Sequence, residues 1–211
     1  MRLTFWGAAR QVTGSMHLLE LSSGKRILID CGLDYENRKE FENKNANFPF
    51  QASEIDLLIV THAHIDHTGN VPNLIKQGFA GEILCTGATL ELSDFLLHDS
   101  LNIQRMEIQK KRKMGSRKKG GIKFGSAPQP LYAKKHIMDM LSMARLLEIG
   151  ESKGFVTFQQ VFNAVTKEKS DPERLDKLLT LLEEHGIEII DDENDRMTAT
   201  TSLSTFVSKL T

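Results

Sequence analysis

The stretch Thr61-His62-Ala63-His64-Ile65-Asp66-His67 follows directly on the apolar run Leu57-Leu58-Ile59-Val60. It places four potential metal ligands within six residues, at the end of what reads as a buried strand. Imidazole and carboxylate ligands together suit zinc, iron or manganese. Where the chain is extended, His62 and His64 point the same way, because side chains two residues apart share a face. The pattern therefore predicts a metal site formed by His62, His64, Asp66 and His67.

A turn at Gly69, Asn70 and Pro72 follows, and it can swing Asp66 and His67 toward a second metal position. Two ions roughly 3.5–4 Å apart hold a bridging hydroxide and polarise an ester or phosphate oxygen. Asp66 is the candidate catalytic residue, either as a ligand or as the group that orients the attacking water. The alternative, a polar loop with exposed histidines, fits lone histidines better than it fits this dense H-x-H-x-D-H pattern.

These residues resemble the signature of the metallo-β-lactamase superfamily, and the Asp30-Cys31-Gly32 turn is similar to its preceding acidic motif. The opening Leu3-Thr4-Phe5-Trp6-Gly7-Ala8-Ala9-Arg10-Gln11-Val12-Thr13-Gly14-Ser15 resembles the β-CASP branch, which includes RNA-cleaving enzymes. The resemblance covers about residues 1–132. It implies an α/β fold, half of an αββα sandwich, with one or two zinc ions and with RNA or another phosphodiester as substrate.

Asp30 has two interpretations that spacing alone leaves open. It can orient a metal-binding histidine from behind the site, or it can be a turn residue that ends a strand. The resemblance favours the first.

Short strands are expected at residues 2–6, 17–22, 26–30, 56–61 and 82–86, and a helix around 71–77. Residues 17–30 look like a hairpin, whereas the strand–helix–strand order of residues 56–86 predicts parallel pairing. A longer helix begins near Thr86 or Thr89 and runs past Ile103. It carries His98 and Asp99. His98 can be an ordinary surface or core histidine, whereas the resemblance implies a supporting role near the metal cleft.

Composition bounds the remaining possibilities. The chain has 211 residues, 40% of them hydrophobic and 26% charged, and a formal net charge of -1, which gives no global attraction to nucleic acid. Its two cysteines do not suggest a secreted disulfide framework. Gly7 interrupts any signal-peptide core, and no apolar run is long enough for a membrane span, so the cytoplasm is the expected location.

Residues 110–123 form one basic block whose glycines and serine predict a mobile loop. Such a block can neutralise phosphates of RNA, but solvated loops look the same, and only Phe124 could stack on a base. The candidate nucleic-acid-binding residues are Lys110, Lys111, Arg112, Lys113, Arg117, Lys118 and Lys119. We expect the first proteolytic cut near residues 113–125.

The composition changes after Pro130. Helices are expected at residues 134–152 and 171–184, with a third after Thr157 and a short strand at 187–192. Residues 144–158 and 178–191 resemble region 1.1 of bacterial primary sigma factors, a small helical domain whose acidic face occupies the DNA channel of RNA polymerase. The resemblance covers about residues 138–195. The expected domains are residues 1–132, an α/β half-sandwich, and residues 133–195, a mainly helical module, followed by a tail at 196–211.

The metallo-β-lactamase resemblance also implies a second half that supplies two more histidines and a bridging aspartate. After Tyr132 no such motif occurs, because His136 and His185 lie in helical contexts. Two functions remain open. One is a metal-dependent hydrolase of β-CASP type that is weak or inactive alone because its zinc site is incomplete. The other is a non-catalytic module that docks on RNA polymerase or another basic surface.

Overall fold

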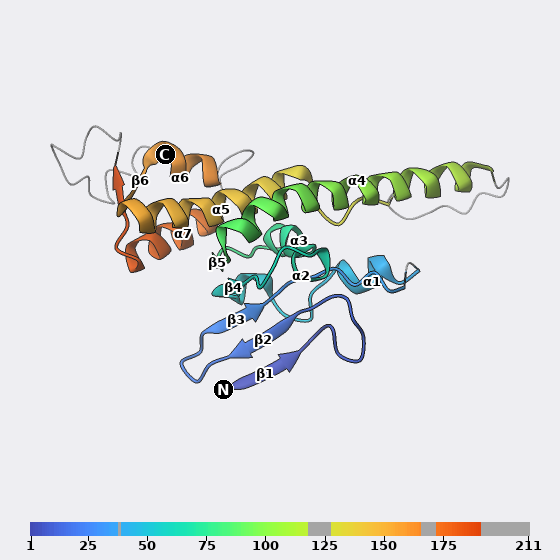
Figure 1. Ribbon diagram of the computed structural model, residues 1–211, viewed down its shortest axis with the longest axis horizontal. Coiled ribbons are helices and arrows are strands. Elements are labelled where there is room, and N and C mark those ends of the chain that lie inside the picture. The colour runs from blue at the N-terminus through green and yellow to red at the C-terminus, as the bar shows by residue number, and fades with distance from the viewer. Residues whose placement is uncertain (38, 118–127, 166–171, 191–211) are drawn as a thin grey trace.

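A computed structural model describes residues 1–37, 39–117, 128–165 and 172–190. Lys118, Lys119, most of the predicted cleavage region and the whole of the predicted tail at 196–211 lie outside these residues. The N-terminal part contains a five-stranded sheet with helices packed on one side, and the C-terminal part is mainly helical (Figure 1). The predicted fold class, an α/β part followed by a mainly helical part, is confirmed.

The sheet has the strand order β1-β2-β3-β4-β5. Its strands are β1 (Arg2–Phe5), β2 (His17–Glu20), β3 (Arg26–Ile29), β4 (Leu57–Ile59) and β5 (Glu82–Leu84). The first three pair antiparallel, so the predicted hairpin is confirmed. The β3–β4 and β4–β5 pairs are parallel, as the predicted crossover requires. The carboxyl ends of β3 and β4 therefore meet at one edge of the sheet.

Helices cover one face of this sheet. They are α1 (Phe41–Asn45), α2 (Ile65–Thr68), α3 (Val71–Lys76) and α4 (Gly87–Arg117), with a 3-10 turn, η1 (Ala52–Glu54), before β4. Leu18, Leu28, Leu58 and Ile83 are almost fully buried on this face and form one core with α3, α4 and α5. Phe41, Phe48 and Phe50 pack against the same core from the connecting segment.

One prediction about the basic block is wrong. Helix α4 continues to Arg117, so Lys110, Lys111, Arg112, Lys113 and Arg117 lie on a helix rather than in a loop. Gly115 costs a helix only about 1 kcal/mol relative to alanine, and no proline interrupts this stretch. Contacts with the protein body also support the helix.

Two of these contacts are specific. The Lys111 Nζ atom lies 2.8 Å from a Glu42 carboxylate oxygen, and the Arg112 guanidinium donates to the Pro128 carbonyl at 2.9 Å. Both hold the far part of α4 to neighbouring segments.

The remaining elements are α5 (Lys134–Lys153), β6 (Phe155–Thr157), α6 (Phe158–Val165), α7 (Pro172–Glu184) and β7 (Glu188–Ile190). β6 and β7 pair in parallel as a separate two-stranded sheet. Thr157 caps α6 as predicted, since its hydroxyl accepts the Gln160 amide proton while the Gln160 side chain accepts that of Thr157.

Helix α5 contributes to two apolar groups. Its Ile137, Met140 and Leu141 are buried in the main core beside α3 and α4. A second buried group, which includes Val156, Val161 and Leu182, lies outside that core among β6, α6 and α7. α5 contacts both β6 and α6, so this one helix connects the two groups. In the part of the chain that the structure describes, no helix has the length and hydrophobicity needed to cross a bilayer.

Candidate metal centre

The H-x-H-x-D-H stretch lies just beyond the carboxyl ends of β3 and β4, where it is held by backbone hydrogen bonds. α2 begins immediately after His64, so a helical turn redirects Asp66 and His67 before the predicted turn at 69–72 is reached. Residues 31–33 run alongside this turn. The Cys31 amide donates to the His67 carbonyl at 2.8 Å and the Leu33 amide to the Ile65 carbonyl at 3.0 Å. These contacts fix the loop to the end of β3.

Gly32 allows this close approach. A Cβ atom at Gly32 would lie only 1.6 Å from the carbonyl oxygen of Asp66. The same carbonyl accepts the Ser15 amide proton at 2.8 Å, and the Gly32 amide donates to the Ser15 carbonyl at 2.9 Å. Three segments that are distant in sequence therefore meet at one backbone junction under the site.

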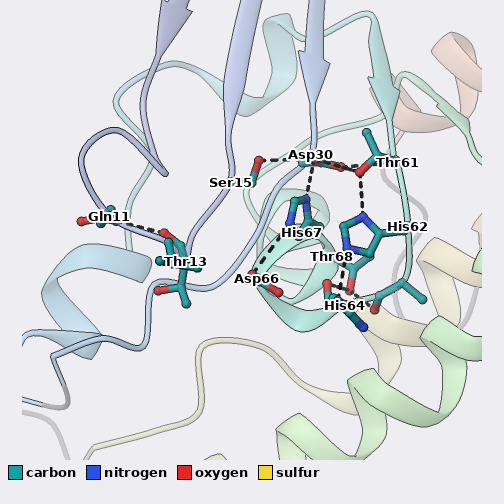
Figure 2. A network of polar contacts seen from close by, with 12 residues as sticks. Gln11, Thr13, Ser15, Asp30, Thr61, His62, His64, Asp66, His67 and Thr68 are labelled. Carbon is teal, nitrogen blue, oxygen red and sulfur yellow. Dashed lines mark hydrogen bonds and ion pairs between the residues drawn. The ribbon is translucent and has the colours of Figure 1, made fainter.

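Asp30 is the centre of the polar network shown in Figure 2. Its buried carboxylate accepts hydrogen bonds from the Thr61 amide and hydroxyl, both at 2.9 Å, and lies 2.7 Å from Nδ1 of His67. The Ser15 hydroxyl donates to it at 3.3 Å. Asp30 thus fixes the residue before His62 and the ring of His67 together.

The backbone of Asp30 has a φ of +59°. Aspartate and asparagine adopt this left-handed conformation more readily than other non-glycine residues, so the position suits both a turn and a network centre. The two interpretations that the sequence left open are compatible in this structure.

The hydrogen bonds determine which ring nitrogens remain available. Because the Asp30 carboxylate can only accept, the neutral His67 ring carries its proton on Nδ1 and keeps its lone pair on Nε2. Nδ1 of His62 lies 3.0 Å from the Thr61 hydroxyl, which leaves Nε2 of His62 facing Nδ1 of His64 at 3.2 Å. Nε2 of His67 lies 3.7 Å from an oxygen of Asp66.

This donor set fits a zinc ion chemically: three imidazoles and one carboxylate lie on one loop, and His67 has the carboxylate partner that metal-binding histidines usually have. The rings of His62 and His67 have centroids 4.0 Å apart. Among the described residues, however, no three His, Cys, Asp or Glu side chains already converge as metal ligands do. Side-chain rotation is therefore needed for the four donors to surround one ion, and the described part of the chain contains no complete metal site.

Two neighbouring groups define the surroundings of the loop. Burial, followed by the charge of Asp66, raises the pKa of Tyr35. Burial, followed by the charge of Asp30, raises the pKa of the Cys31 thiol so far that it stays protonated at neutral pH. Cys31 is fully buried and belongs to the main core, so it is a packing residue here.

A cavity of about 340 Å³ lies between α1, α2 and α4. Tyr35, Phe41 and Ile65 line it on the side of the loop, and Gln104 and Lys111 line it on α4. Ile65, the residue before Asp66, is the part of α2 that lines it.

The other histidines of the sequence analysis lie elsewhere. His98 contacts Asp94 of its own helix at 3.0 Å, and Nδ1 of His136 accepts the Ala133 amide proton at the start of α5. His185 lies 3.6 Å from Glu82. Lys110 and Lys113 are exposed on α4. None of these residues takes part in the hydrogen-bond network around Asp30 that the structure describes.

The partners of Asp30 were not identified from the sequence. Thr61 stands directly before the histidines, and Ser15 closes the opening motif that suggested the β-CASP branch. Both positions were therefore visible as neighbours of recognisable motifs. Only the fold shows that they bind the same carboxylate.

Comparison with known proteins assigns this arrangement to a family. Residues 9–133 match the family model of the metallo-β-lactamase superfamily. The chain belongs to this superfamily. Its members typically bind zinc, which agrees with the donor set described above. Residues 139–206 match the family model of Sigma-70 factor, region 1.1, and this match extends beyond the predicted residue 195.

Relatives of the superfamily domain are found in bacteria and archaea. Ribonuclease TTHA0252 of Thermus thermophilus is 44% identical over 103 residues, which are 49% of this chain and 23% of the relative. Transcription termination factor FttA of Methanococcus maripaludis is 38% identical over 109 residues, or 51% of this chain and 17% of the relative. The chain thus spans a quarter or less of these relatives. Among solved structures, the short form of human tRNase Z aligns with 22% identity over 47% of this chain and 40% of its own, with a TM-score of 0.33.

The network predicts a specific effect of Asp30→Asn. The asparagine tolerates the left-handed backbone, but it no longer supplies the charge that holds the His67 proton on Nδ1. Loss of such an outer partner lowers metal affinity by about 10–100-fold. We expect this loss in a zinc titration against a chromophoric chelator. Asp176→Asn, at an exposed position on α7, serves as the control and should bind zinc like the unchanged chain. Equal affinity of all three proteins would contradict the assigned role of Asp30.

Proposed function

We propose that this chain is a metal-binding, hydrolase-like protein of β-CASP type, with RNA or another phosphodiester as its substrate class and little or no turnover by itself. The observation that carries the proposal is the loop in which His62, His64, Asp66 and His67 present their donors beside Asp30. The names of the matched relatives, a ribonuclease and transcription termination factors, support an RNA-related substrate.

Each residue has a role in this proposal. His62, His64 and His67 hold zinc, together with Asp66 or with Asp66 free to orient the attacking water. Asp30 keeps the His67 proton on Nδ1, so that the lone pair on Nε2 stays available for a metal ion. A zinc ion, when bound, lowers the pKa of its water and polarises a phosphoryl oxygen.

Substrate binding has two further candidates. Tyr35 and Phe41 line the cavity that Ile65 of α2 also lines, and they offer ring faces on which a base can stack. Lys110 and Lys113 on the last turns of α4, with Lys111, Arg112 and Arg117 near them, offer positive charge for phosphates. Lys111 and Arg112 are already engaged with Glu42 and Pro128, which limits what they add.

Low activity follows from what comes after Tyr132. A binuclear hydrolase needs a bridging carboxylate and opposing histidines that fix both ions. The residues that follow instead form α5 and match a different family from residue 139 onward. One loop can hold an ion, but it cannot by itself clamp both the attacking and the leaving oxygen.

An RNA cleavage assay tests this proposal. With zinc or manganese present, cleavage should be at least roughly 100-fold slower than that of an intact β-CASP ribonuclease under the same conditions, because the missing clamp contributes several kcal/mol to transition-state stabilisation. Comparable turnover that a chelator removes, and that is absent from a His64→Ala variant, would show that the site is complete and the low-activity proposal is wrong.

A second candidate function is favoured by the match of residues 139–206. A module similar to sigma region 1.1 can dock on RNA polymerase or another basic surface without any catalysis. The N-terminal part would then be a metal-binding remnant. Specific co-sedimentation with purified bacterial RNA polymerase, unchanged by His62→Ala, would favour this function over the first.

A further inference from the structure

One face of the five-stranded sheet carries two continuous rows of side chains that the core does not use. The strand register aligns Leu3, Leu19, Ile27, Leu57 and Glu82 in the first row. It aligns Phe5, His17, Ile29, Ile59 and Leu84 in the second. Eight of these ten side chains are apolar. We refer to these ten residues as the outer face.

The outer face is uncovered by the described residues. Leu3, Phe5 and Leu84 are 47%, 59% and 51% exposed, and the apolar residues between them are partly exposed. The alternate residues of the same strands point to the opposite face, where Leu28 and Leu58 are fully buried under the helices. None of the ten belongs to the main core or packs against it. The sheet therefore has two apolar faces, and the described helices cover only one.

The charges on the outer face limit the kind of partner that can bind there. Glu82 is the only acidic residue on the outer face, which has no lysine or arginine. His185 lies 3.6 Å from Glu82 at the edge. The ring of His17 packs edge-on against Phe5, with centroids 5.0 Å apart. A nucleic acid or a charged protein surface finds no counter-charge here, whereas another apolar sheet matches it.

We propose that the outer face is the contact surface between two copies of this chain. The proposal goes beyond the proposed function and does not rest on it. Two sheets stack about 10 Å apart and within about 30° of one another because both have the same right-handed twist. A second copy supplies a sheet of identical width, twist and apolar character. Two-fold pairing of the same patch also closes the assembly at two subunits.

The size of the face predicts a weak dimer. Five strands about 4.8 Å apart, each with three or four residues of about 3.3 Å, give a footprint of roughly 24 by 12 Å, or about 300 Å². The side chains protrude, so the accessible area exceeds this footprint, but the contact stays at the small end of protein interfaces. Weak association that depends on protein concentration is therefore the expected result.

The position of the outer face allows variants that change the contact without changing the histidine loop. A two-fold axis through the centre of the sheet places β3 over β3, and it keeps β1 and β5 inside the contact whether it runs along or across the strands. The histidine loop lies beyond the carboxyl ends of β3 and β4, outside the two rows. Phe5→Lys and Leu84→Lys therefore introduce a charge at either side of the contact without touching a proposed metal ligand.

Sedimentation equilibrium of the full chain from about 1 μM to about 300 μM tests the proposal. The unchanged chain should shift from monomer to dimer over this range, while Phe5→Lys and Leu84→Lys each stay monomeric. Phe95→Lys is the matched control, because Phe95 is 75% exposed on α4, away from the outer face. It should dimerise like the unchanged chain. Thermal unfolding of all four proteins shows whether each variant is folded.

Three outcomes would overturn the proposal. They are an unchanged chain that is monomeric throughout, a dimer that persists in both lysine variants, and open-ended growth beyond two subunits. If one lysine variant fails to fold, the other decides the result.

Discussion

A Gly32→Ala variant is expected to be strongly destabilised, because the added methyl group has no space. The new Cβ atom would lie 1.6 Å from the Asp66 carbonyl oxygen and 2.1 Å from its carbon. Both are backbone atoms of the turn that carries the candidate ligands, so no flexible side chain can move aside. The turn must shift, and the hydrogen bonds that join residues 31–33 to residues 65–67 must lengthen.

Overpacking in a rigid site costs about 1–3 kcal/mol and occasionally more, and the backbone contact here favours the upper end, about 3 kcal/mol. Denaturant unfolding followed by circular dichroism measures this cost. Gly24→Ala is the control. Its Cβ would meet no atom within 4 Å, but its φ of +92° still imposes backbone strain, so a smaller cost of about 1–2 kcal/mol is expected. Equal unfolding free energies of the two variants would contradict the packing described around Gly32.

The parts of the fold that the sequence predicted depend on local patterns. The hairpin at β2 and β3 and the strand before His62 have short apolar runs bounded by turn residues. Such runs can be recognised from the local sequence without knowledge of the rest of the fold. The start of α4 at Thr86 and the start of α6 at Thr157 follow from capping residues. Each of these signals lies within a few residues of the structure that it specifies.

The errors and omissions came from interactions between distant segments. The continuation of α4 through Gly115 was missed because its support comes partly from Glu42 and Pro128, which lie far away in sequence. An amphipathic pattern also cannot show which core a helix joins, so the burial of Ile137 beside α3 and α4 became visible only in the structure.

In the candidate site, too, the locally specified features were predictable and those that depend on distant segments were not. The four donors His62, His64, Asp66 and His67 were predicted from spacing, and they remain a prediction for metal binding. Their orientation was not predictable, because it depends on Asp30 and its contacts with Thr61 and Ser15 across three segments. The turn that redirects Asp66 and His67 also begins earlier than expected, since Ile65 starts a helical turn that packs against Leu33.

The central claim is that His62 and His64 hold a metal ion, and removing both imidazoles should abolish binding. Nε2 of His62 and Nδ1 of His64 face each other at 3.2 Å, so these two nitrogens already lie close enough to approach one ion. Asp66 and His67 alone leave a two-donor site, which holds zinc far more weakly than the three or four ligands that zinc sites use. The double variant should therefore lose zinc during buffer exchange.

The decisive measurement is the zinc content of the purified chain after zinc loading and gel filtration, determined by mass spectrometry of the metal. At least one equivalent is expected for the unchanged chain and for a His98→Ala/His136→Ala control, whose histidines bind Asp94 and the start of α5 instead. The His62→Ala/His64→Ala variant should retain almost none. Equal zinc in all three proteins would contradict the assignment of this loop as the metal centre.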